Sequence, residues 1–247
     1  MIRESVLRVG GLSFRVRSSD GPEGTSRTFV LIHGIGASHR YLSRLHERLA
    51  ATGSVHSIDL PGFAGLPKPD HAPDIAETAT ALGDVLTRLG VERAVLVGHS
   101  MGAQWVVELG AQRPELTEAV VVIGPVTDSE HRSAPAQAVA LTADVLGETP
   151  GANAIVFTDY LRCGPRWYAR HLPFMIGYPI EERVAALTAP LLVIRGGNDP
   201  VAGIRWCRRL RDSAAEGFVA VVPGHRHVVQ HTAPGAVASA IIAHLRP

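Results

Sequence analysis

A serine in a tight glycine turn stands out as a residue placed to do chemistry. The pentapeptide Gly-His-Ser-Met-Gly (residues 98–102) follows the apolar run Ala94–Val97 and precedes Ala103–Ala111, which reads as a helix. The β-branched content of the apolar run is typical of a buried parallel strand. A strand, Gly-x-Ser-x-Gly and a helix predict a sharp turn that exposes the serine oxygen at a helix N-terminus, where negative charge is favoured. We therefore predict Ser100 as a nucleophile; an ordinary turn between two core elements is the alternative.

A nucleophilic serine requires a base to take its proton and an acid to hold that base in one tautomer. His225, His227 and His231 all lie on the loop after the last predicted strand. Asp199 follows the preceding buried strand, where its carboxylate is placed to orient a histidine, although aspartate also commonly caps helices. Asp128, which follows an earlier strand, is the alternative acid.

Other polar residues near the strand ends have structural interpretations. His33 precedes a glycine at the end of a strand, and we expect it to support its loop by hydrogen bonding. Asp59 is expected to brace its own loop. The side chain of His99 should point away from the adjacent serine. His39 and His46 lie in polar or helical segments and are expected to be solvated.

Strand-like and helix-like segments alternate along the chain, which predicts a mostly parallel sheet with helices on both faces. The predicted strands are Val6–Val9, Leu12–Arg17, Thr28–Ile32, Val55–Ile58, Ala94–Val97, Ala119–Ile123, Leu191–Ile194 and Phe218–Val222. The predicted helices are Arg40–Ala51, Ile75–Leu89, Ala103–Ala111, Gly203–Ala214 and Pro234–Leu245. Ligands bind such sheets at the carboxyl ends of the strands. The residues predicted at these ends are Asp59, Ser100, Asp128, Asp199 and His227.

The regular pattern breaks between Val126 and Leu187. This stretch is rich in proline and glycine, and its clearest helical piece is Ala136–Leu146. It also holds six of the thirteen aromatic residues of the chain. Such a segment is typical of an insertion between two strands.

The composition is that of a globular protein. The 247 residues are 46% hydrophobic and 19% charged, and the net charge of +1 gives no reason to expect nucleic-acid or anionic-membrane binding. The N-terminus resembles no signal peptide, and no apolar run approaches the roughly 18–20 residues of a membrane span. Cys163 and Cys207 form no close-spaced motif, and no metal or dinucleotide signature occurs. We expect a cytoplasmic monomer or homodimer with a small-molecule substrate, no cofactor and no metal.

Five segments together resemble the α/β-hydrolase family. They are Leu31–Gly36, Asp59–Phe63, residues 98–102, Gly196–Val201 and Pro223–Pro234, and they span nearly the whole chain in the family's order of serine, acid and histidine. Members usually carry a proline seven residues after the histidine, so the resemblance implies His227 as the base rather than His225. Arg226 departs from the glycine that members normally have there, while Gly224 precedes His225 and leaves that alternative open.

The resemblance also implies an oxyanion site and a cap. Backbone N–H groups of Ile35 and Met101 are the expected oxyanion donors. Residues 1–125 and 188–247 would form the α/β-hydrolase core, and residues 126–187 an inserted helical cap. The aromatic residues of the cap suggest an apolar substrate pocket, for which we predict Trp105, Phe157 and Trp167. Simple packing between cap and core is the alternative for these side chains.

These inferences predict a cofactor-independent serine hydrolase. It would cleave a carboxylic ester of a small to medium apolar substrate through an acyl-enzyme, with Ser100, His227 and Asp199 as the catalytic residues. Serine instead of aspartate at position 100 argues against haloalkane dehalogenase and epoxide hydrolase chemistry. Thioester cleavage, carbon–carbon bond hydrolysis, perhydrolysis and acyl transfer or cyclisation remain alternatives on the same residues. A non-catalytic ligand-binding member of the fold is an alternative of another class.

Overall fold

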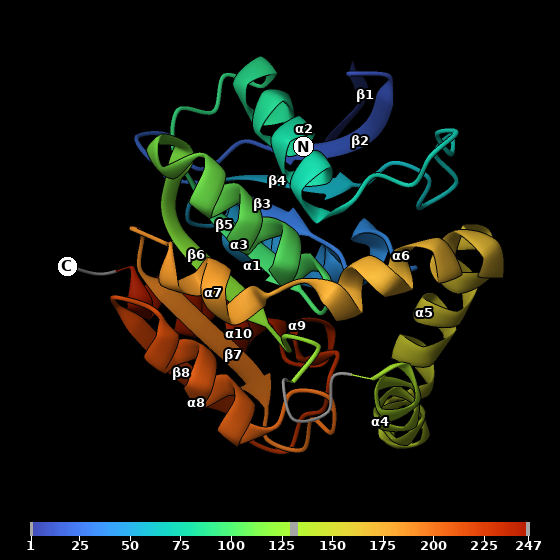
Figure 1. Cartoon of the computed structure of the whole chain (residues 1–247). Coiled ribbons are helices and arrows are strands. Elements are labelled where there is room, and N and C mark those ends of the chain that lie inside the picture. Colours follow the sequence, from blue (N-terminus) through green and yellow to red (C-terminus); the bar gives the residue numbers. More distant parts are fainter. Residues whose placement is uncertain (1, 129–132, 246–247) are drawn as a thin grey trace.

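In the computed structural model of the protein, which describes residues 2–128 and 133–245, eight strands form one sheet (Figure 1). The strands are β1 (Arg3–Val9), β2 (Leu12–Ser19), β3 (Thr28–Ile32), β4 (Ser54–Asp59), β5 (Ala94–His99), β6 (Thr117–Ile123), β7 (Leu191–Gly196) and β8 (Gly217–Val222). Their spatial order is β1-β2-β4-β3-β5-β6-β7-β8. Strand β2 runs antiparallel to both its neighbours, and the pairs from β4 to β8 are parallel. The predicted mostly parallel α/β sheet is confirmed.

Helices connect the strands and flank the sheet. They are η1 (His39–Leu42), α1 (Ser43–Ala50), α2 (Ile75–Arg88), α3 (Gly102–Gln112), η2 (Pro114–Leu116), α4 (Ala134–Gly147), α5 (Pro150–Cys163), α6 (Pro165–Gly177), α7 (Ile180–Ala185), α8 (Ile204–Ser213), α9 (Val229–Thr232) and α10 (Pro234–His244). In the part of the chain that the structure describes, no helix is both long and apolar enough to pass through a bilayer.

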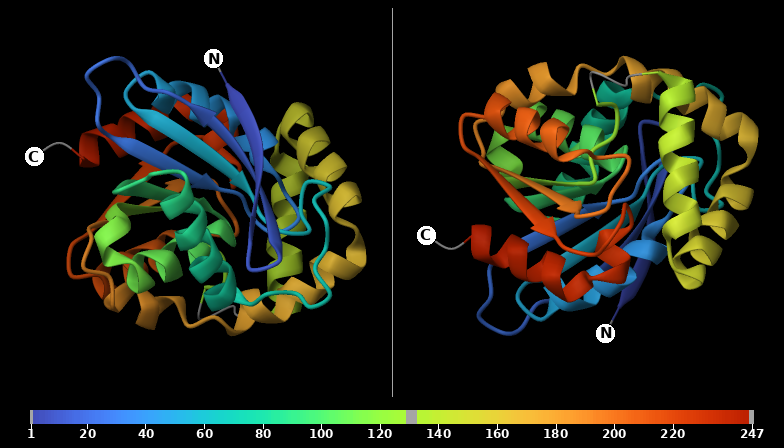
Figure 2. Two further views of the ribbon diagram at one scale, coloured as in Figure 1. Left: turned by 90° about the horizontal axis from the view of Figure 1, so that it is seen from above. Right: turned by 90° about the horizontal axis from the view of Figure 1, so that it is seen from below.

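Both faces of the sheet are buried because the strands alternate their side chains between two apolar clusters. In β3, Val30 and Ile32 join the cluster that includes α2, α3 and α8, whereas Phe29 and Leu31 join the cluster that includes α1 and α10. The two views of Figure 2 show helices on opposite sides of the sheet. Burial on both faces explains why these strands read as continuous apolar runs.

Four helices, α4 to α7, are inserted between β6 and β7, where the sequence pattern breaks. Figure 1 shows α4, α5 and α6 together beside the sheet, and α7 returns to contact α3 and α8. Pro150 and Pro165 occupy the first turns of α5 and α6, where proline has no helical hydrogen bond to lose. These prolines therefore begin helices instead of breaking them. The division into a core and a cap at residues 126 and 187 stays a prediction, and residues 129–132 lie outside the described residues.

Candidate active site

Ser100 lies in the turn between β5 and α3, near the centre of the sheet. Its backbone φ of +57° is one that a non-glycine residue rarely adopts, and it marks a strained turn. A Cβ on Gly98 would lie 2.2 Å from the carbonyl oxygen of Gly102, and a Cβ on Gly102 would lie 2.5 Å from that of Ile32. Only glycine fits at these two positions, because strand, turn and helix meet there. The geometry agrees with the turn predicted for the pentapeptide.

The loop after β3 lies against Ser100. A Cβ on Gly34 would be 2.9 Å from that of Ser100, so the two backbones are in close contact. His33 Nδ1 donates to the carbonyl oxygen of Gly34 at 2.7 Å, while His33 Nε2 accepts from the amide of Leu60 at 3.1 Å. In a trans peptide the carbonyl and the following N–H point in opposite directions. His33 therefore orients the Gly34–Ile35 peptide so that the N–H of Ile35 points away from the His33 ring.

Met101 carries the second of the two N–H groups that we predicted for the oxyanion site. It follows Ser100 and directly precedes α3, so its amide belongs to the helix end whose N–H groups have no intrahelical partner. Ile35 borders the same cavity as Ser100. The two main-chain donors predicted for an oxyanion thus belong to loops that meet at the serine.

His227 and Asp199 form a buried pair beside this turn. The Nδ1 atom of His227 lies 3.0 Å from Oδ2 of Asp199, and each residue is 4% exposed. The other carboxylate oxygen of Asp199 accepts from the amides of Val201 and Ala202 at 2.8 and 3.1 Å. These bonds fix the carboxylate, which in turn fixes the imidazole with its proton on Nδ1.

The pair also fits closely against the end of β6. A Cβ on Gly124 would lie 2.9 Å from Nδ1 of His227 and 3.2 Å from Oδ2 of Asp199. Because Gly124 has no side chain, there is room beside it for the pair of His227 and Asp199. The available sequence signal was the position of Gly124 directly after the apolar run Ala119–Ile123.

Electrostatics stabilise the ionised carboxylate of Asp199 and increase the proton affinity of His227. Burial alone would raise the pKa of Asp199, but the imidazole of His227 and the two amides hold it below its usual value. Burial likewise disfavours the imidazolium, but Asp199, Asp144 and Glu148 raise the pKa of His227. The Nε2 atom of His227 is buried and has no hydrogen-bond partner among the described residues. Its lone pair is free to accept a proton at the cavity that it borders.

The alternative residues are engaged elsewhere. His225 Nδ1 lies 3.0 Å from the hydroxyl of Thr232, away from the carboxylate of Asp199. Asp128 forms an ion pair with Arg209 of α8. The structure thus brings together Ser100, His227 and Asp199 and keeps His225 and Asp128 outside that group.

A cavity of about 370 Å³ opens beside Ser100 and His227. Its wall is mostly apolar, and much of it comes from the inserted helices. Residues of α4, α5 and α6 that border it are Leu141, Thr142, Asp144, Val145, Asn153, Val156, Tyr160, Tyr168 and Met175.

The three aromatic residues predicted for the pocket do not border this cavity. Trp105 and Trp167 are 1% and 2% exposed and pack with Phe63, with ring centroids 6.2 and 6.4 Å from it. Phe157 is 65% exposed on α5. The prediction is corrected because the aromatic residues of the insertion divide between packing, solvent and cavity, and those that border the cavity are Tyr160 and Tyr168.

In the sequence, residues 29–240 match the model of a protein family described as the alpha/beta hydrolase family. The chain belongs to the alpha/beta hydrolase family.

Relatives of this chain include esterase- and lipase-like proteins. A monoacylglycerol lipase from Mycolicibacterium smegmatis is 29% identical over 81% of this chain and 80% of the lipase. An sn-1-specific diacylglycerol lipase from Mus musculus is 26% identical over 92% of this chain and 83% of that protein. The crystal structure of an esterase from a Rhodococcus species shares the fold, with a TM-score of 0.81 and 22% identity over 99% of this chain and 98% of the esterase. Uncharacterized proteins of Mycobacterium bovis and Mycobacterium tuberculosis are 31% identical over 100 residues, which are 40% of this chain but only 29% of those proteins.

Two residues that the sequence interpretation did not assign to the candidate site, Tyr41 and His99, connect its loops. The Tyr41 hydroxyl accepts from the Gly34 amide at 2.7 Å and donates to His99 Nδ1 at 2.8 Å. The Nε2 atom of His99 donates to the carbonyl oxygen of His227 at 3.0 Å. Burial and then the nearby His227 lower the pKa of His99 to about 3, which keeps this imidazole neutral. Although we expected His99 to point away from the serine, it borders the cavity and connects the loops of Gly34 and His227.

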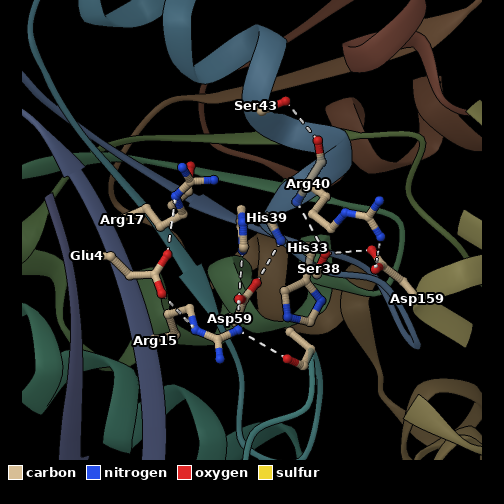
Figure 3. Close-up of polar contacts among 12 residues, drawn as sticks. Glu4, Arg15, Arg17, His33, Ser38, His39, Arg40, Ser43, Asp59 and Asp159 are labelled. Atoms are coloured by element: carbon tan, nitrogen blue, oxygen red, sulfur yellow. Dashed lines mark hydrogen bonds and ion pairs between the residues drawn. The ribbon is translucent and has the colours of Figure 1, made fainter. Parts of the chain in front are cut away.

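Asp59, which we expected to brace its own loop, binds the start of η1 (Figure 3). Its buried carboxylate accepts from the backbone amide of His39 at 2.6 Å, from Nδ1 of His39 at 2.7 Å and from Arg15 at 3.3 Å. The expectation that His39 and His46 are solvated is wrong. His46 is 3% exposed and lies between the hydroxyls of Ser57 and Ser19, because it faces the sheet from α1.

No group of His, Cys, Asp and Glu side chains within residues 2–128 and 133–245 is arranged to hold a metal ion. Cys163 and Cys207 are both buried and free.

Proposed function

We propose that this hydrolase cleaves carboxylic esters by serine catalysis through an acyl-enzyme intermediate. One observation carries the proposal: Ser100, in its strained turn, shares an apolar cavity with a histidine whose Nδ1 is held by Asp199 and whose Nε2 lacks a partner among the described residues. This is the set of roles that acyl transfer requires of a nucleophile, a base and an orienting acid. The esterase- and lipase-like relatives support the same class of bond.

In the proposed first step, the Ser100 oxygen attacks the ester carbonyl while His227 Nε2 takes the hydroxyl proton. The N–H groups of Ile35 and Met101 stabilise the negative charge that develops on the carbonyl oxygen. The tetrahedral intermediate then expels the alcohol, which receives the proton from His227. Water, activated by the same histidine, releases the acid and restores Ser100.

The substrate proposed for this site has a small to medium apolar acyl group. The cavity volume of about 370 Å³ and its largely apolar wall favour such a group over a charged one. We also propose that helices α4 to α7 act as a cap, since α4, α5 and α6 supply much of that wall.

The first experiment is a series of p-nitrophenyl esters from acetate to decanoate. Wild type should hydrolyse them, and Ser100→Ala and His227→Ala should each lose on the order of 10⁴-fold or more in kcat/KM. His225→Ala is the matched control, since it alters a histidine of the same loop that does not contact Asp199. A fluorophosphonate should label wild type at Ser100 and leave Ser100→Ala unlabelled. Wild type without turnover or labelling would instead favour a ligand-binding role.

A further inference from the structure

Two carboxylates of the inserted helices are almost completely buried. Asp144 of α4 is 4% exposed and Asp159 of α5 is 1% exposed. A carboxylate that leaves water loses its hydration and is tolerated only where donors replace it. For both residues, the donors come from the loops that surround Ser100.

Asp144 binds the loop that carries His227. Its Oδ1 accepts from the main-chain amide of His227 at 3.0 Å and lies 3.5 Å from Nε of Arg226. One turn further along, Glu148 accepts from the amide of Val228 at 3.2 Å. The His227 backbone is therefore held from the inserted helices, while its side chain is held from the core by Asp199.

Arg226, the residue that departs from the family pattern, strengthens this attachment. Its guanidinium donates to the carbonyl oxygen of Ala143 at 2.6 Å. It lies over Gly147 so closely that a Cβ there would be 2.4 Å from the guanidinium carbon. A glycine in place of Arg226 would lack these contacts with α4.

Asp159 binds the other loop in a similar way (Figure 3). The hydroxyl of Ser38 donates to Oδ2 of Asp159 at 2.5 Å, and Arg40 donates to Oδ1 at 3.0 Å. The ring of Tyr160, the next residue of α5, packs on Gly36, where a Cβ would lie 2.7 Å from the ring. The loop that holds the Ile35 amide is thus attached to α5.

We propose that Asp144 and Asp159 are positioning residues that attach the base loop and the oxyanion loop to the inserted helices, so that the catalytic arrangement is complete only when α4 and α5 are seated. This inference rests on the function proposed above for Ser100 and His227. Each carboxylate is satisfied by loop donors, and each loop is oriented by the carboxylate, so that neither partner keeps its geometry alone.

The first test compares Asp144→Ala, Asp144→Asn and Asp159→Ala with Glu182→Gln, a control that removes a negative charge from an exposed position of α7. Asp144→Ala leaves the His227 amide without its acceptor, and Asp159→Ala leaves the Ser38 hydroxyl and Arg40 without theirs. Each change should lower kcat on the order of tenfold, with a smaller change in KM. Asp144→Asn keeps an oxygen acceptor and should recover most of the loss. The control should match wild type.

The pH profile separates positioning from general loss of structure. The groups that face His227 are Asp199, Asp144, Glu148 and His99, and of these the Asp144→Asn change removes one negative charge. Because that charge favours the imidazolium, the acid limb of kcat/KM should move to lower pH in Asp144→Asn. In Glu182→Gln the acid limb of kcat/KM should lie at the same pH as in wild type.

Hydrogen exchange tests the attachment without relying on turnover. Amides of residues 226–228 should exchange faster in Asp144→Ala, and amides of residues 34–40 faster in Asp159→Ala. If both loops keep wild-type exchange, or if kcat stays at the wild-type value, the positioning role is overturned. Wild type that shows loop protection but neither hydrolysis nor labelling would contradict the proposed function and leave the attachment established.

Discussion

Ser100 and His227 border one cavity, yet they are held in different ways. Ser100 belongs to a turn within the core: β5 lies between β3 and β6, and all its residues are buried. His227 follows β8, one of the two edge strands, in which Phe218 and Val221 are 46% and 44% exposed. Its loop depends on Asp199 and on the inserted helix α4.

The difference implies that nucleophile and base respond to different parts of the molecule. The serine turn is fixed by backbone contacts that form whenever the central sheet folds. The histidine loop is fixed by side-chain hydrogen bonds that need α4 in place. Changes to the core should therefore affect stability and activity together, whereas changes to the inserted helices should affect activity first.

The largest effect is expected for Asp199→Asn, which keeps a side-chain oxygen to accept from the amides of Val201 and Ala202. An amide at this position no longer holds the imidazole with its proton on Nδ1, so kcat should fall on the order of 10⁴-fold. Ester hydrolysis measures the loss, and thermal unfolding checks that the fold persists. A loss of less than tenfold would mean that another group orients His227.

Gly102→Ala should damage the serine turn itself. The new Cβ would lie 2.5 Å from the carbonyl oxygen of Ile32 and 2.7 Å from that of His33, and backbone atoms have little room to move. We expect the free energy of unfolding to fall by about 1–3 kcal/mol and activity to fall more than tenfold. Urea unfolding and ester hydrolysis should change together. A stable but inactive variant would show that the serine turn is not coupled to the stability of the central sheet.

Tyr41→Phe should have an intermediate effect. It removes the hydroxyl that accepts from the Gly34 amide and donates to His99, and leaves a buried N–H without its acceptor. The cost of such a group is about 1–3 kcal/mol, part of which should appear as a roughly tenfold loss of kcat. Steady-state kinetics of Tyr41→Phe beside wild type would measure it. Unchanged kcat would show that His33 alone orients the Ile35 peptide.

Gly147→Ala should have the smallest effect, although the added Cβ would come as close as 2.4 Å to its neighbour. The neighbour here is the end of a flexible arginine side chain, Arg226, which can shift. We expect a change of less than about threefold in kcat and under about 0.5 kcal/mol in stability. A loss comparable to that of Gly102→Ala would show that the Arg226 contacts with α4 are as rigid as the core.

The sequence was sufficient for the parts of the fold that repeat a simple pattern. Strand β3 and the start of α2 have their predicted bounds because period and capping signals agree there, and Asp74 with Glu77 forms the capping box before α2. The same regularity predicted that Ser100, Asp199 and the loop with three histidines lie at one edge of the sheet, since residues after parallel strands meet there. The choice of His227 among those histidines came from the family resemblance.

Tertiary packing decided what the sequence left open. Phe157 and Tyr160 are three residues apart on α5, but one faces solvent and the other the cavity, and residue type does not distinguish these positions. The roles of Asp144 and Asp159 depend on loops far away in the chain. Arg226 in place of a glycine was the available signal, and only the fold shows that its partners lie on α4.

The neutral buried histidines have a consequence for proton uptake. Burial lowers the pKa of His33, of His46 to about 4 and of His99 to about 3, whereas the unfolded chain binds these protons near pH 6.5. As the pH falls below 6.5, unfolding therefore takes up protons, and the free energy of unfolding declines until the native imidazoles also titrate. Burial also lowers the pKa of His56, His171, His231 and His244. His227, whose pKa is raised, opposes this trend as one histidine against seven. Acid should thus destabilise the fold through these buried imidazoles, and the urea midpoint of unfolding should be lower at pH 5 than at pH 7.5. His46→Gln has a side chain that cannot be protonated, so the difference between its two midpoints should be smaller than in wild type.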